Sequence, residues 1–301
     1  MLIKYIQREH LDEEKYNNCI ENSIQSNSYA FSWYLDIVCD NWDVLVLNDY
    51  EAVMPIPWRK KYGIKYVYQP LWVLQLGIFS KGDFTQSDFI SVVQKRFRFI
   101  ELRLNFKNLL DTDSLYFIEK QFQELKLTVG YEKIKKAYRS DRKKDLKRAE
   151  KSELRIEWGG SPSDLITLFQ NNVGKRTPEI KQQDYQNLET LINFCLIDDY
   201  GELCFAYQGE TLVAAAFFLK HKETATILCS STDFSNRKNG ANTFLIDEVI
   251  QRYVNRYKIF NFGGSSMQTI AKYFYSFGSE TKYYQQLKYN KLPFFLKWFK
   301  R

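Results

Sequence analysis

The stretches DVLVLNDYEAVMPI (Asp43–Ile56) and LCFAYQGETLVAAAF (Leu203–Phe217) decide the fold, because they carry one pattern twice. Each reads as an apolar strand, a tight turn and a second apolar strand. The turns fall at Asn48-Asp49 and at Gln208-Gly209, residue types that favour tight turns. The sequence therefore predicts two β-hairpins, with Gln208 following Asn48 by 160 positions.

The elements after each hairpin also follow one order: another apolar strand, a polar loop, a helix and a short strand. The short strand is centred on Ile100 in the first half and on Phe260 in the second, again 160 positions apart. A repeat of this length predicts two halves of like α/β fold, each a mixed, mostly antiparallel sheet flanked by helices. Ligands commonly bind in the cleft that two such halves leave between them.

The expected domains follow from this repeat. Residues 1–132 form the first half, residues 133–288 form the second, and residues 289–301 form a tail that packs back on the body. Because this tail is aromatic and basic, the alternative is contact with a membrane surface. Apolar periodicity and turn residues predict these further elements: a helical start over 1–42, helix 86–96, strands 97–105, 115–117, 122–129 and 154–158, helices 163–173 and 182–198, strand 224–231, helix 242–256, strand 258–262, a short helix ending near 275, and strand 281–288.

The composition excludes several classes of site. The chain has only two histidines, His10 and His221, which argues against a Ser-His-Asp triad and against a histidine metal site. Its five cysteines are scattered and form no CxxC pair, so neither a zinc site nor a disulfide framework is expected. Aromatic residues make up 17% of the chain, enough to fill cores and also to line a ligand groove.

No apolar run reaches the roughly 18 residues of a membrane helix, and the N-terminus turns charged too early for a signal peptide. We therefore expect a cytoplasmic protein without a transmembrane segment.

The positive charge is concentrated in one stretch. Residues 133–151 carry ten Lys or Arg and three Asp or Glu, an excess that equals the net charge of +7. The stretch reads as one helix with a sparse apolar stripe at Ile134, Tyr138, Leu146 and Ala149. It is either a solvated linker helix or a site for polyanions, such as the phosphates of a nucleotide-linked substrate or of tRNA; DNA is not expected as a partner.

Three segments are candidates for binding and chemistry. The first lies between a strand and a helix, where a helix N-terminus, a glycine and two cations suit a pyrophosphate. The ordinary alternative is a loop with Asn242 as helix N-cap. Its residues are Arg237, Lys238, Asn239, Gly240, Ala241 and Asn242.

The second candidate follows the strand around Phe260. Glycines after a strand end let the backbone face a ligand, and the aromatic run Tyr273–Phe277 would form a water-poor wall. The alternative is a tight turn with core aromatics.

The third candidate, in the first half, combines cations, aromatics and glutamines that could bind a polar acceptor, or could be a hairpin end and a core strand. Its residues are Arg59, Lys60, Tyr68, Gln69, Trp72 and Gln75.

These residues resemble a known family over nearly the whole chain. The order strand, loop, glycine, helix, strand is similar to the core of the GNAT acyltransferases, in which the loop and helix N-terminus hold the coenzyme A pyrophosphate. Two such halves in tandem resemble the bacterial FemABX peptidyltransferases and FemAB-like acetyltransferases. The segments that carry the resemblance are SDRKKDLKRA (140–149), NGANTFLIDEVI (239–250), FNFGGS (260–265), AKYFYSFGSE (271–280) and, in the first half, SWYLDIVCDNWDVLV, VMPIPWRKKYG and YVYQPLWVLQLGIFS.

The sequence departs from that family at three points. FemABX enzymes often carry a lysine after the phenylalanine of the last helix, whereas here Tyr275 follows Phe274, and Lys272 lies nearby. The helical arm that some relatives use for tRNA has no counterpart in the second half. The loop at Arg237–Ala241 matches the acyl-CoA glycine pattern only in part. These departures favour a FemAB-like N-acyltransferase over a tRNA-dependent cell-wall enzyme.

The resemblance implies an enzyme that transfers an acyl group from acyl-CoA, a donor substrate and not a covalently bound cofactor, to an amine on a small molecule or cell-envelope precursor. The donor phosphates would bind at Arg237–Asn242. Its carbonyl would lie near Phe262, Gly263, Gly264 and Ser265, with Tyr275 or Lys272 managing proton transfer or carbonyl polarisation. The first half would bind the acceptor. Two alternatives stay open: a tRNA-dependent aminoacyltransferase of peptidoglycan synthesis, and a non-catalytic binder of a polyanion or nucleotide-sugar.

Overall fold

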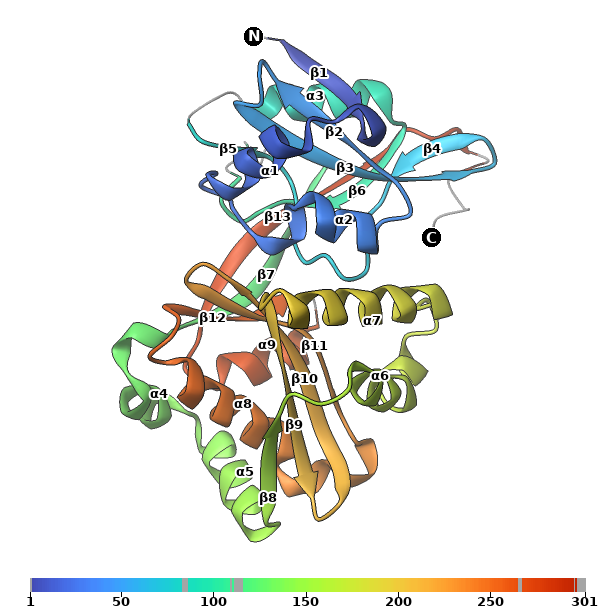
Figure 1. Ribbon diagram of the computed structural model, residues 1–301. Coiled ribbons are helices and arrows are strands. Elements are labelled where there is room, and N and C mark those ends of the chain that lie inside the picture. Colours follow the sequence, from blue (N-terminus) through green and yellow to red (C-terminus); the bar gives the residue numbers. More distant parts are fainter. Residues whose placement is uncertain are drawn as a thin grey trace. The chain divides into compact units, whose positions relative to one another are not determined.

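The computed structural model describes residues 2–82, 86–108, 110, 116–264, 267–294 and 296 (Figure 1). The chain divides into two compact units, residues 1–120 with 283–301, and residues 121–282. These boundaries differ from the expected ones, because residues 121–132 belong to the second unit and residues 283–288 to the first. None of the helices in the described ranges has the length and hydropathy of a membrane span.

The first unit is a sheet with three helices and two short 3-10 helices in the part of the chain that the structure describes. Its elements are β1 (Ile3–Gln7), η1 (Arg8–His10), α1 (Glu13–Glu21), η2 (Ser28–Ala30), α2 (Ser32–Val38), β2 (Trp42–Leu47), β3 (Ala52–Lys61), β4 (Ile64–Val67), β5 (Phe79–Ser80), α3 (Gln86–Arg96), β6 (Phe99–Arg103) and the second part of β13 (Glu280–Asn290). The strands follow the order β1-β2-β3-β4-β6-β13, and β5 pairs with β3.

The second unit is also a sheet flanked by helices. Its elements are β7 (Phe117–Lys126), η3 (Leu127–Val129), α4 (Tyr131–Ala137), α5 (Ser140–Lys151), β8 (Leu154–Trp158), α6 (Pro162–Asn171), η4 (Gly174–Arg176), α7 (Gln182–Ile197), β9 (Gly201–Gln208), β10 (Thr211–His221), β11 (Thr224–Thr232), η5 (Phe234–Asn239), α8 (Ala241–Tyr253), β12 (Ile259–Gly264) and α9 (Gln268–Tyr275). The strand order is β7-β12-β11-β10-β9-β8. Helices α6 and α7 cover one face, and α8 with α5 covers the other (Figure 1).

The two sheets have the same order and the same strand directions. In the first unit β1 to β4 are successively antiparallel, β4 is parallel to β6, and β6 is antiparallel to β13. In the second unit β8 to β11 are successively antiparallel, β11 is parallel to β12, and β12 is antiparallel to β7. The hairpins β2–β3 and β9–β10 confirm the two that the sequence predicts.

The last strand of each sheet comes from the other half of the sequence. Strand β7 follows β6 in the chain, yet its residues from Phe122 to Lys126 pair with β12. Strand β13 follows β12 in the chain, yet Gln286–Asn290 pair with β6. This exchange explains the shifted unit boundaries, because the sequence analysis assumed that each half closes its own sheet.

Three local predictions were wrong in part. The predicted helical start contains α1 and α2, but it also contains strand β1, which pairs with β2 from Ile3↔Leu47 to Gln7↔Asp43. The predicted strands at 115–117 and 122–129 are one strand, β7, followed by η3. The basic stretch forms two helices, α4 and α5, because the backbone is extended at Tyr138 and Arg139. There Tyr138 donates its hydroxyl hydrogen to Asp247, and the Arg139 N–H donates to the Ser276 carbonyl.

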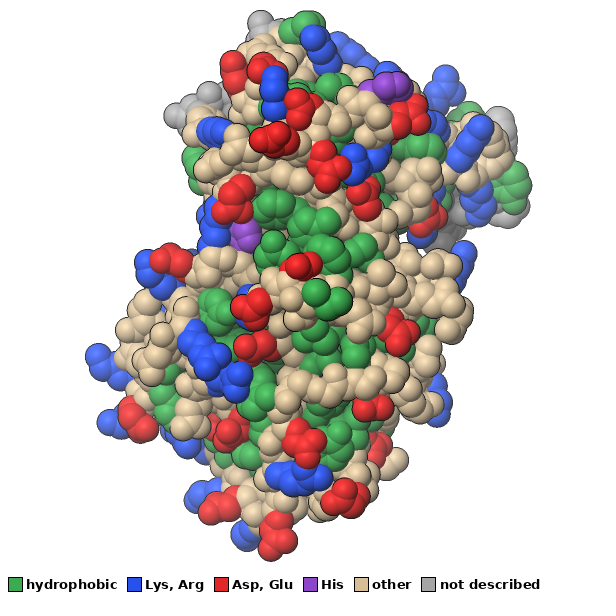
Figure 2. Space-filling view, viewed as in Figure 1, with side chains coloured by type: hydrophobic (Ala, Val, Ile, Leu, Met, Phe, Trp, Pro, Cys, Tyr) green, Lys and Arg blue, Asp and Glu red, His purple; other side chains and the backbone are tan. Residues whose placement is uncertain are grey.

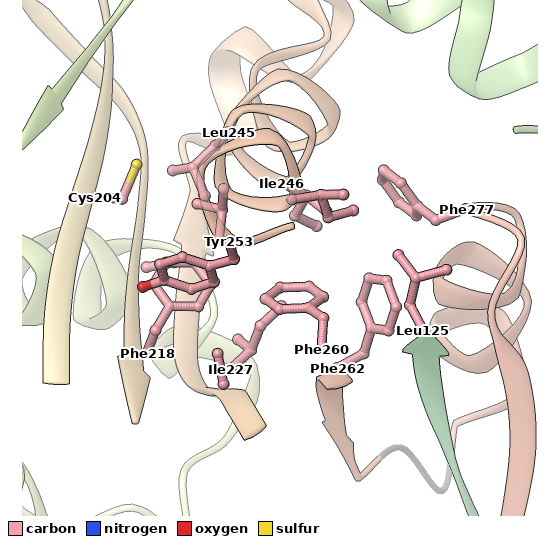
Figure 3. Packing of buried hydrophobic residues seen from close by; sticks show 14 of the residues in the cluster. Leu125, Cys204, Phe218, Ile227, Leu245, Ile246, Tyr253, Phe260, Phe262 and Phe277 are labelled. Carbon is pink, nitrogen blue, oxygen red and sulfur yellow. The ribbon is translucent and has the colours of Figure 1, made fainter. Parts of the chain in front are cut away.

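The core of the second unit is rich in aromatic residues. Figure 3 shows a row of rings between α8 and the sheet that includes Phe218, Tyr253, Phe260 and Phe262. Consecutive ring centroids in this row lie 6.0, 6.3 and 4.9 Å apart, and edge or tilted contacts of this kind add to the stabilisation from burial alone. The packed rings anchor α8 on the sheet, and α8 carries the candidate site at its N-terminus.

Candidate functional site

The site begins where β11 and β12 separate. The two strands are parallel partners only over Thr224–Thr226 and Ile259–Asn261. Strand β11 then has a β-bulge at Leu228, because Leu228 has no partner residue in β10. A β-bulge bends the strand that contains it. Strand β12 continues to Gly264 and pairs with β7 along its other edge. In the register of the described residues, the β11 backbone after Thr226 therefore has no strand partner on its β12 side.

The segment after β11 is held in a fixed conformation up to the first turn of α8. The Asp233 side chain caps η5 by accepting a hydrogen bond from the Ser235 N–H at 2.9 Å. Asn239 Oδ1 accepts from the Ala241 N–H at 3.0 Å and so occupies the first free donor of α8. Side-chain hydrogen bonds thus fix both ends of the loop.

Gly240 joins this loop to α8. It adopts the left-handed conformation, with φ of 81°, and α8 begins at the next residue, Ala241, so the helix N-cap is Gly240 and not Asn242. A Cβ atom at Gly240 would overlap the backbone carbonyl oxygen of Asp145 in α5. Only glycine therefore allows α5 to pack this closely against the start of α8.

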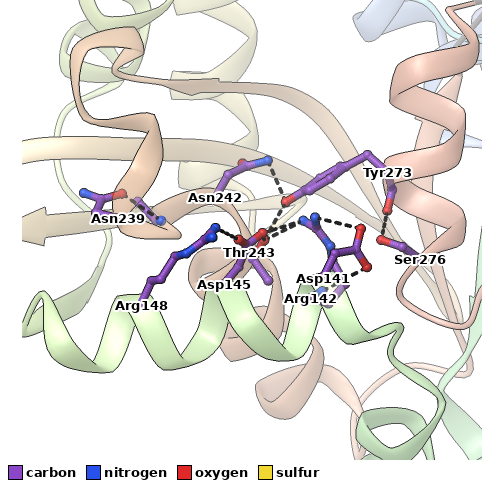
Figure 4. A network of polar contacts seen from close by, with 10 residues as sticks. Asp141, Arg142, Asp145, Arg148, Asn239, Asn242, Thr243, Tyr273 and Ser276 are labelled. Atoms are coloured by element: carbon purple, nitrogen blue, oxygen red, sulfur yellow. Dashed lines mark hydrogen bonds and ion pairs between the residues drawn. The ribbon is translucent and has the colours of Figure 1, made fainter.

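A buried arginine links α5, α8 and α9 (Figure 4). Arg142 is 8% exposed, and its Nη1 lies 3.0 Å from the Asp145 carboxylate and 2.8 Å from the Thr243 hydroxyl oxygen. Its guanidinium carbon also lies 4.3 Å from the centroid of the Tyr273 ring. Arg142 Nε is buried without an acceptor in the part of the chain that the structure describes. The α8 N-terminus is thus held by charge-assisted hydrogen bonds from a neighbouring helix.

Tyr273 completes this network from α9. Its hydroxyl oxygen accepts from Asn242 Nδ2 at 2.9 Å and lies 3.2 Å from the Thr243 hydroxyl. Burial raises the pKa of Tyr273 to about 12, with an opposing contribution from the Thr243 hydrogen bond and from Arg142. The phenol therefore stays protonated at neutral pH and remains able to donate a hydrogen bond.

The first turn of α8 keeps two backbone donors available. Within the described residues, the N–H groups of Asn242 and Thr243 have no hydrogen-bond acceptor. Such donors and the helix dipole favour an anion. Asp141 and Asp145 place two negative charges near this turn, and Arg142 and Arg148 pair with them. Because that network is nearly neutral, further cations must supply the charge that binds a phosphate.

Those cations lie on η4 and η5. The guanidinium carbons of Arg237 and Arg176 lie 3.4 and 4.3 Å from the centroid of the Phe234 ring. Burial lowers the pKa of Arg237, and the neighbouring charge of Arg176 lowers it further. Neither arginine, nor Lys238, is paired with a carboxylate among the residues described here. An anion would relieve the repulsion between the two arginines, so this cationic edge suits a phosphate-bearing ligand.

The predicted catalytic residues do not gather at this turn. The Tyr275 side chain is 45% exposed and lies beneath Arg139, whose guanidinium carbon is 5.2 Å from the ring centroid. Lys272 is exposed on the same helix, and Ser265 lies outside the described residues. The α9 residue that reaches the α8 N-terminus is Tyr273. The roles predicted for Tyr275, Lys272 and Ser265 stay predictions.

The sequence places Gly263 and Gly264 after a strand that ends at Phe262, whereas in the structure they are the last two residues of β12. Phe262 is buried, and its ring stacks on Phe274 with centroids 5.0 Å apart. The Gly263 N–H donates to Asn261 Oδ1 at 2.8 Å, and Gly263 has a positive φ of 75°. Gly264 is exposed. Of these positions, Gly264 is the one where the backbone can face a ligand directly.

The predicted acceptor residues lie in the first unit. Arg59 forms two hydrogen bonds to the Asp40 carboxylate, at 2.7 and 2.8 Å, and stacks 4.1 Å above the Tyr68 ring. Lys60 is exposed beside it. These residues form one polar cluster at the foot of the β3–β4 hairpin.

The other predicted acceptor residues support the backbone. Gln69 accepts from the Arg103 N–H at 2.8 Å and donates to the Val73 carbonyl, and Gln75 accepts from the Phe106 N–H at 3.0 Å. Trp72 is buried. These hydrogen bonds hold the segment between β4 and β6 in place.

The sequence analysis missed the residues that build the network. Arg142 and Asp145 lie in the basic stretch, which reads locally as solvated, and their burial depends on α8 and α9. The one available signal is that Arg142 and Asp145 share a helical face with Ala149, which belongs to the predicted stripe. Arg176 was missed because its partner Phe234 lies far along the chain.

Comparison with known proteins finds a similar domain in the second half. Residues 135–274 match the family model of the acetyltransferase (GNAT) domain, a range that begins within α4, ends within α9 and includes η5 and α8. This match confirms the GNAT resemblance and supports an acyltransferase function. No curated protein matches the sequence.

Solved structures share the fold over nearly the whole chain. FemX is similar with a TM-score of 0.63 and 8% identity, covering 95% of this chain and 97% of its own. A GNAT-family acetyltransferase from Colwellia psychrerythraea has a TM-score of 0.54 and 12% identity, covering 96% of this chain and 100% of its own. The C-terminal domain of a putative lysylphosphatidylglycerol synthetase from Agrobacterium fabrum has a TM-score of 0.53 and 13% identity, covering 93% and 91%. These likenesses confirm the predicted fold class.

Proposed function

We propose that this chain, whose residues 135–274 match the GNAT-type acetyltransferase domain, is an N-acyltransferase that moves an acyl group from acyl-CoA to an amine. The observation that carries the proposal is the open edge of β11, which separates from β12 after Thr226 and leads into the α8 N-terminus. An extended acyl-pantetheine chain could pair with such an edge while its phosphates meet the helix.

The donor phosphates would bind at the start of α8. The N–H groups of Asn242 and Thr243 would donate to the pyrophosphate, and Gly240 lets α8 begin directly after the loop. Arg237, Lys238 and Arg176 would supply the positive charge, since Arg142 and Arg148 are already paired with Asp145.

The reaction would take place between the bulge of β11 and the end of β12 at Gly264. The amine nitrogen attacks the thioester carbonyl, a C–N bond forms, the C–S bond breaks, and the thiolate takes up the proton that the nitrogen loses. Backbone N–H groups near Leu228 or Gly264 would stabilise the oxyanion, at about 3 kcal/mol per donor. Tyr275 or Lys272 would handle the proton, and Ser265 would contribute its hydroxyl group.

Of the first-unit residues, Arg59, Lys60 and Tyr68 would contact a polar acceptor, because Gln69, Trp72 and Gln75 are occupied in the fold.

A thiol-release assay tests this function. The chain is incubated with acetyl-CoA and a panel of amines, including aminosugars and amino acids, and free CoA thiol is measured. The proposal predicts release that depends on the amine, with the acylated amine as the second product. Release that no amine increases, or no release at high enzyme concentration, would favour the non-catalytic binder.

The cationic edge gives a second prediction. Arg237→Ala and Arg176→Ala should each raise KM for acyl-CoA about tenfold and leave kcat nearly unchanged, because each removes a charged hydrogen bond far from the reacting carbonyl. Both losses should shrink at high salt. The matched control is Lys258→Ala, a cation paired with Glu223 at the opposite end of β12. If this control raises KM equally, the phosphates do not bind at η5.

A tRNA-dependent aminoacyltransferase is the second candidate. Helices α4 and α5 expose a dense set of cations, namely Lys133, Lys135, Lys136, Lys143, Lys144 and Lys147. If tRNA carries the acyl group, its binding should weaken steeply with salt, and Lys144→Glu with Lys147→Glu should reduce that slope.

A further inference from the structure

The β3–β4 hairpin has a basic and aromatic tip. Residues 57–67 (PWRKKYGIKYV) contain four cations and no carboxylate. Arg59 is paired with Asp40, whereas Lys60, Lys61 and Lys65 are exposed. Tyr62 stands at the turn and is 72% exposed. The hairpin therefore presents an aromatic ring surrounded by lysines.

The segment after β13 has the same chemistry. Residues 289–301 (YNKLPFFLKWFKR) contain four cations and five aromatic residues and no carboxylate. The Lys291 N–H donates to the Arg98 carbonyl at 2.8 Å, which ties the segment to the start of β6. Phe294 is 84% exposed.

The hairpin and this segment lie together. Leu292 and Leu296 line one small apolar hollow with Lys61, Tyr62 and Ile64 of the hairpin. Figure 2 shows lysines next to apolar side chains over this hairpin, at the upper right of the view. The described residues of these two acid-free segments, which are distant in the sequence, thus form one surface with an apolar floor, exposed rings and a cationic rim.

We propose that this surface, the hairpin–tail surface (Lys60, Lys61, Tyr62, Lys65, Lys291 and Phe294), docks on an anionic lipid membrane. Aromatic rings favour the headgroup region of a bilayer, and lysines near an anionic bilayer each strengthen binding about fivefold. A protein surface that combines exposed aromatic rings with lysines, and has no carboxylate in either segment, is complementary to a negatively charged membrane interface. The aliphatic floor of Ile64, Leu292 and Leu296 favours lipid over RNA. RNA binds through base stacking on aromatic rings and through its charged backbone, and it does not bury aliphatic side chains.

Vesicle co-sedimentation of the full chain tests the proposal. The chain should sediment with vesicles of phosphatidylcholine mixed with phosphatidylglycerol and stay in solution with phosphatidylcholine alone. Lys60→Glu with Lys61→Glu should weaken binding at least tenfold, and Tyr62→Ser with Phe294→Ser should remove the part of the binding that survives high salt. All four side chains are exposed, so the thermal unfolding midpoint should stay unchanged.

The matched control reverses two charges elsewhere, Lys144→Glu with Lys147→Glu on α5, and should leave vesicle binding unchanged. An equal loss in this control would mean that net charge alone drives binding, and would overturn the proposal. So would absence of binding to the anionic vesicles. Binding of bulk RNA that the hairpin variants lose, without vesicle binding, would assign the surface to RNA. None of these readouts depends on acyl transfer.

Discussion

Gly240→Ala is expected to lower the free energy of unfolding by about 3 kcal/mol. A left-handed residue other than glycine costs about 1–2 kcal/mol, and forcing an atom into a packed contact costs about 1–3 kcal/mol more. Here the new methyl would overlap the Asp145 carbonyl oxygen, so α5 or the first turn of α8 must move. Because that turn carries the proposed phosphate donors, acyl-CoA affinity should also fall at least tenfold. Urea unfolding and calorimetric titration measure the two effects.

The control for this variant is Gly209→Ala. Gly209 also has a positive φ, 56°, but a Cβ there meets no atom within 4 Å. Its cost should therefore be about 1 kcal/mol, without loss of donor binding. Equal destabilisation by the two variants would show that backbone conformation, and not the contact with α5, restricts position 240 to glycine.

Arg142→Met is expected to destabilise the second unit by about 3 kcal/mol. Removal of one member of a buried ion pair leaves the other charge poorly compensated, and this costs about 3–5 kcal/mol where burial is complete. The Asp145 side chain keeps Arg148 and is 19% exposed, so the lower end of that range applies. The variant also loses the hydrogen bond to Thr243 and the contact with Tyr273. Urea unfolding measures the loss.

Two further variants locate the source of this loss. Arg142→Met with Asp145→Asn should recover about half of it, because the second change removes the poorly compensated charge. Arg148→Met, at a side chain that is 59% exposed, should change stability by less than about 0.5 kcal/mol. If Arg148→Met lowers the free energy of unfolding as much as Arg142→Met does, the burial of Arg142 is not the cause of its contribution to stability.

The sequence predicts the hairpins and most elements of the second half because those elements are fixed locally. Strand β8 and helix α3 have the predicted bounds, and α7 differs by one residue at its end. Alternating or continuous apolar runs bounded by turn residues carry this information within about ten residues. The loop at Arg237–Asn242 was found in the same way, since strand, glycine and helix follow one another directly.

The features that the sequence does not predict depend on contacts between distant segments. Strand β7 pairs with the sheet of the second unit and strand β13 with the sheet of the first. The local sequence pattern of each strand fits either sheet, so it does not predict this exchange. The break between α4 and α5 follows from the contact of Tyr138 with Asp247, more than a hundred residues away. Tyr273 was passed over for Tyr275 because the resemblance aligns Tyr275 with a family lysine, whereas the structure places the Tyr273 hydroxyl on α8.

The most direct test of the account is a calorimetric titration of the chain with acetyl-CoA at two salt concentrations, with bulk aminoacyl-tRNA as the comparison ligand. The account predicts one binding event for acetyl-CoA, with a Kd of about 1 μM to 1 mM, that weakens with salt and weakens further in Arg237→Ala. Salt-sensitive binding of tRNA without any binding of acetyl-CoA would contradict it and favour the aminoacyltransferase. Binding of neither ligand would contradict both.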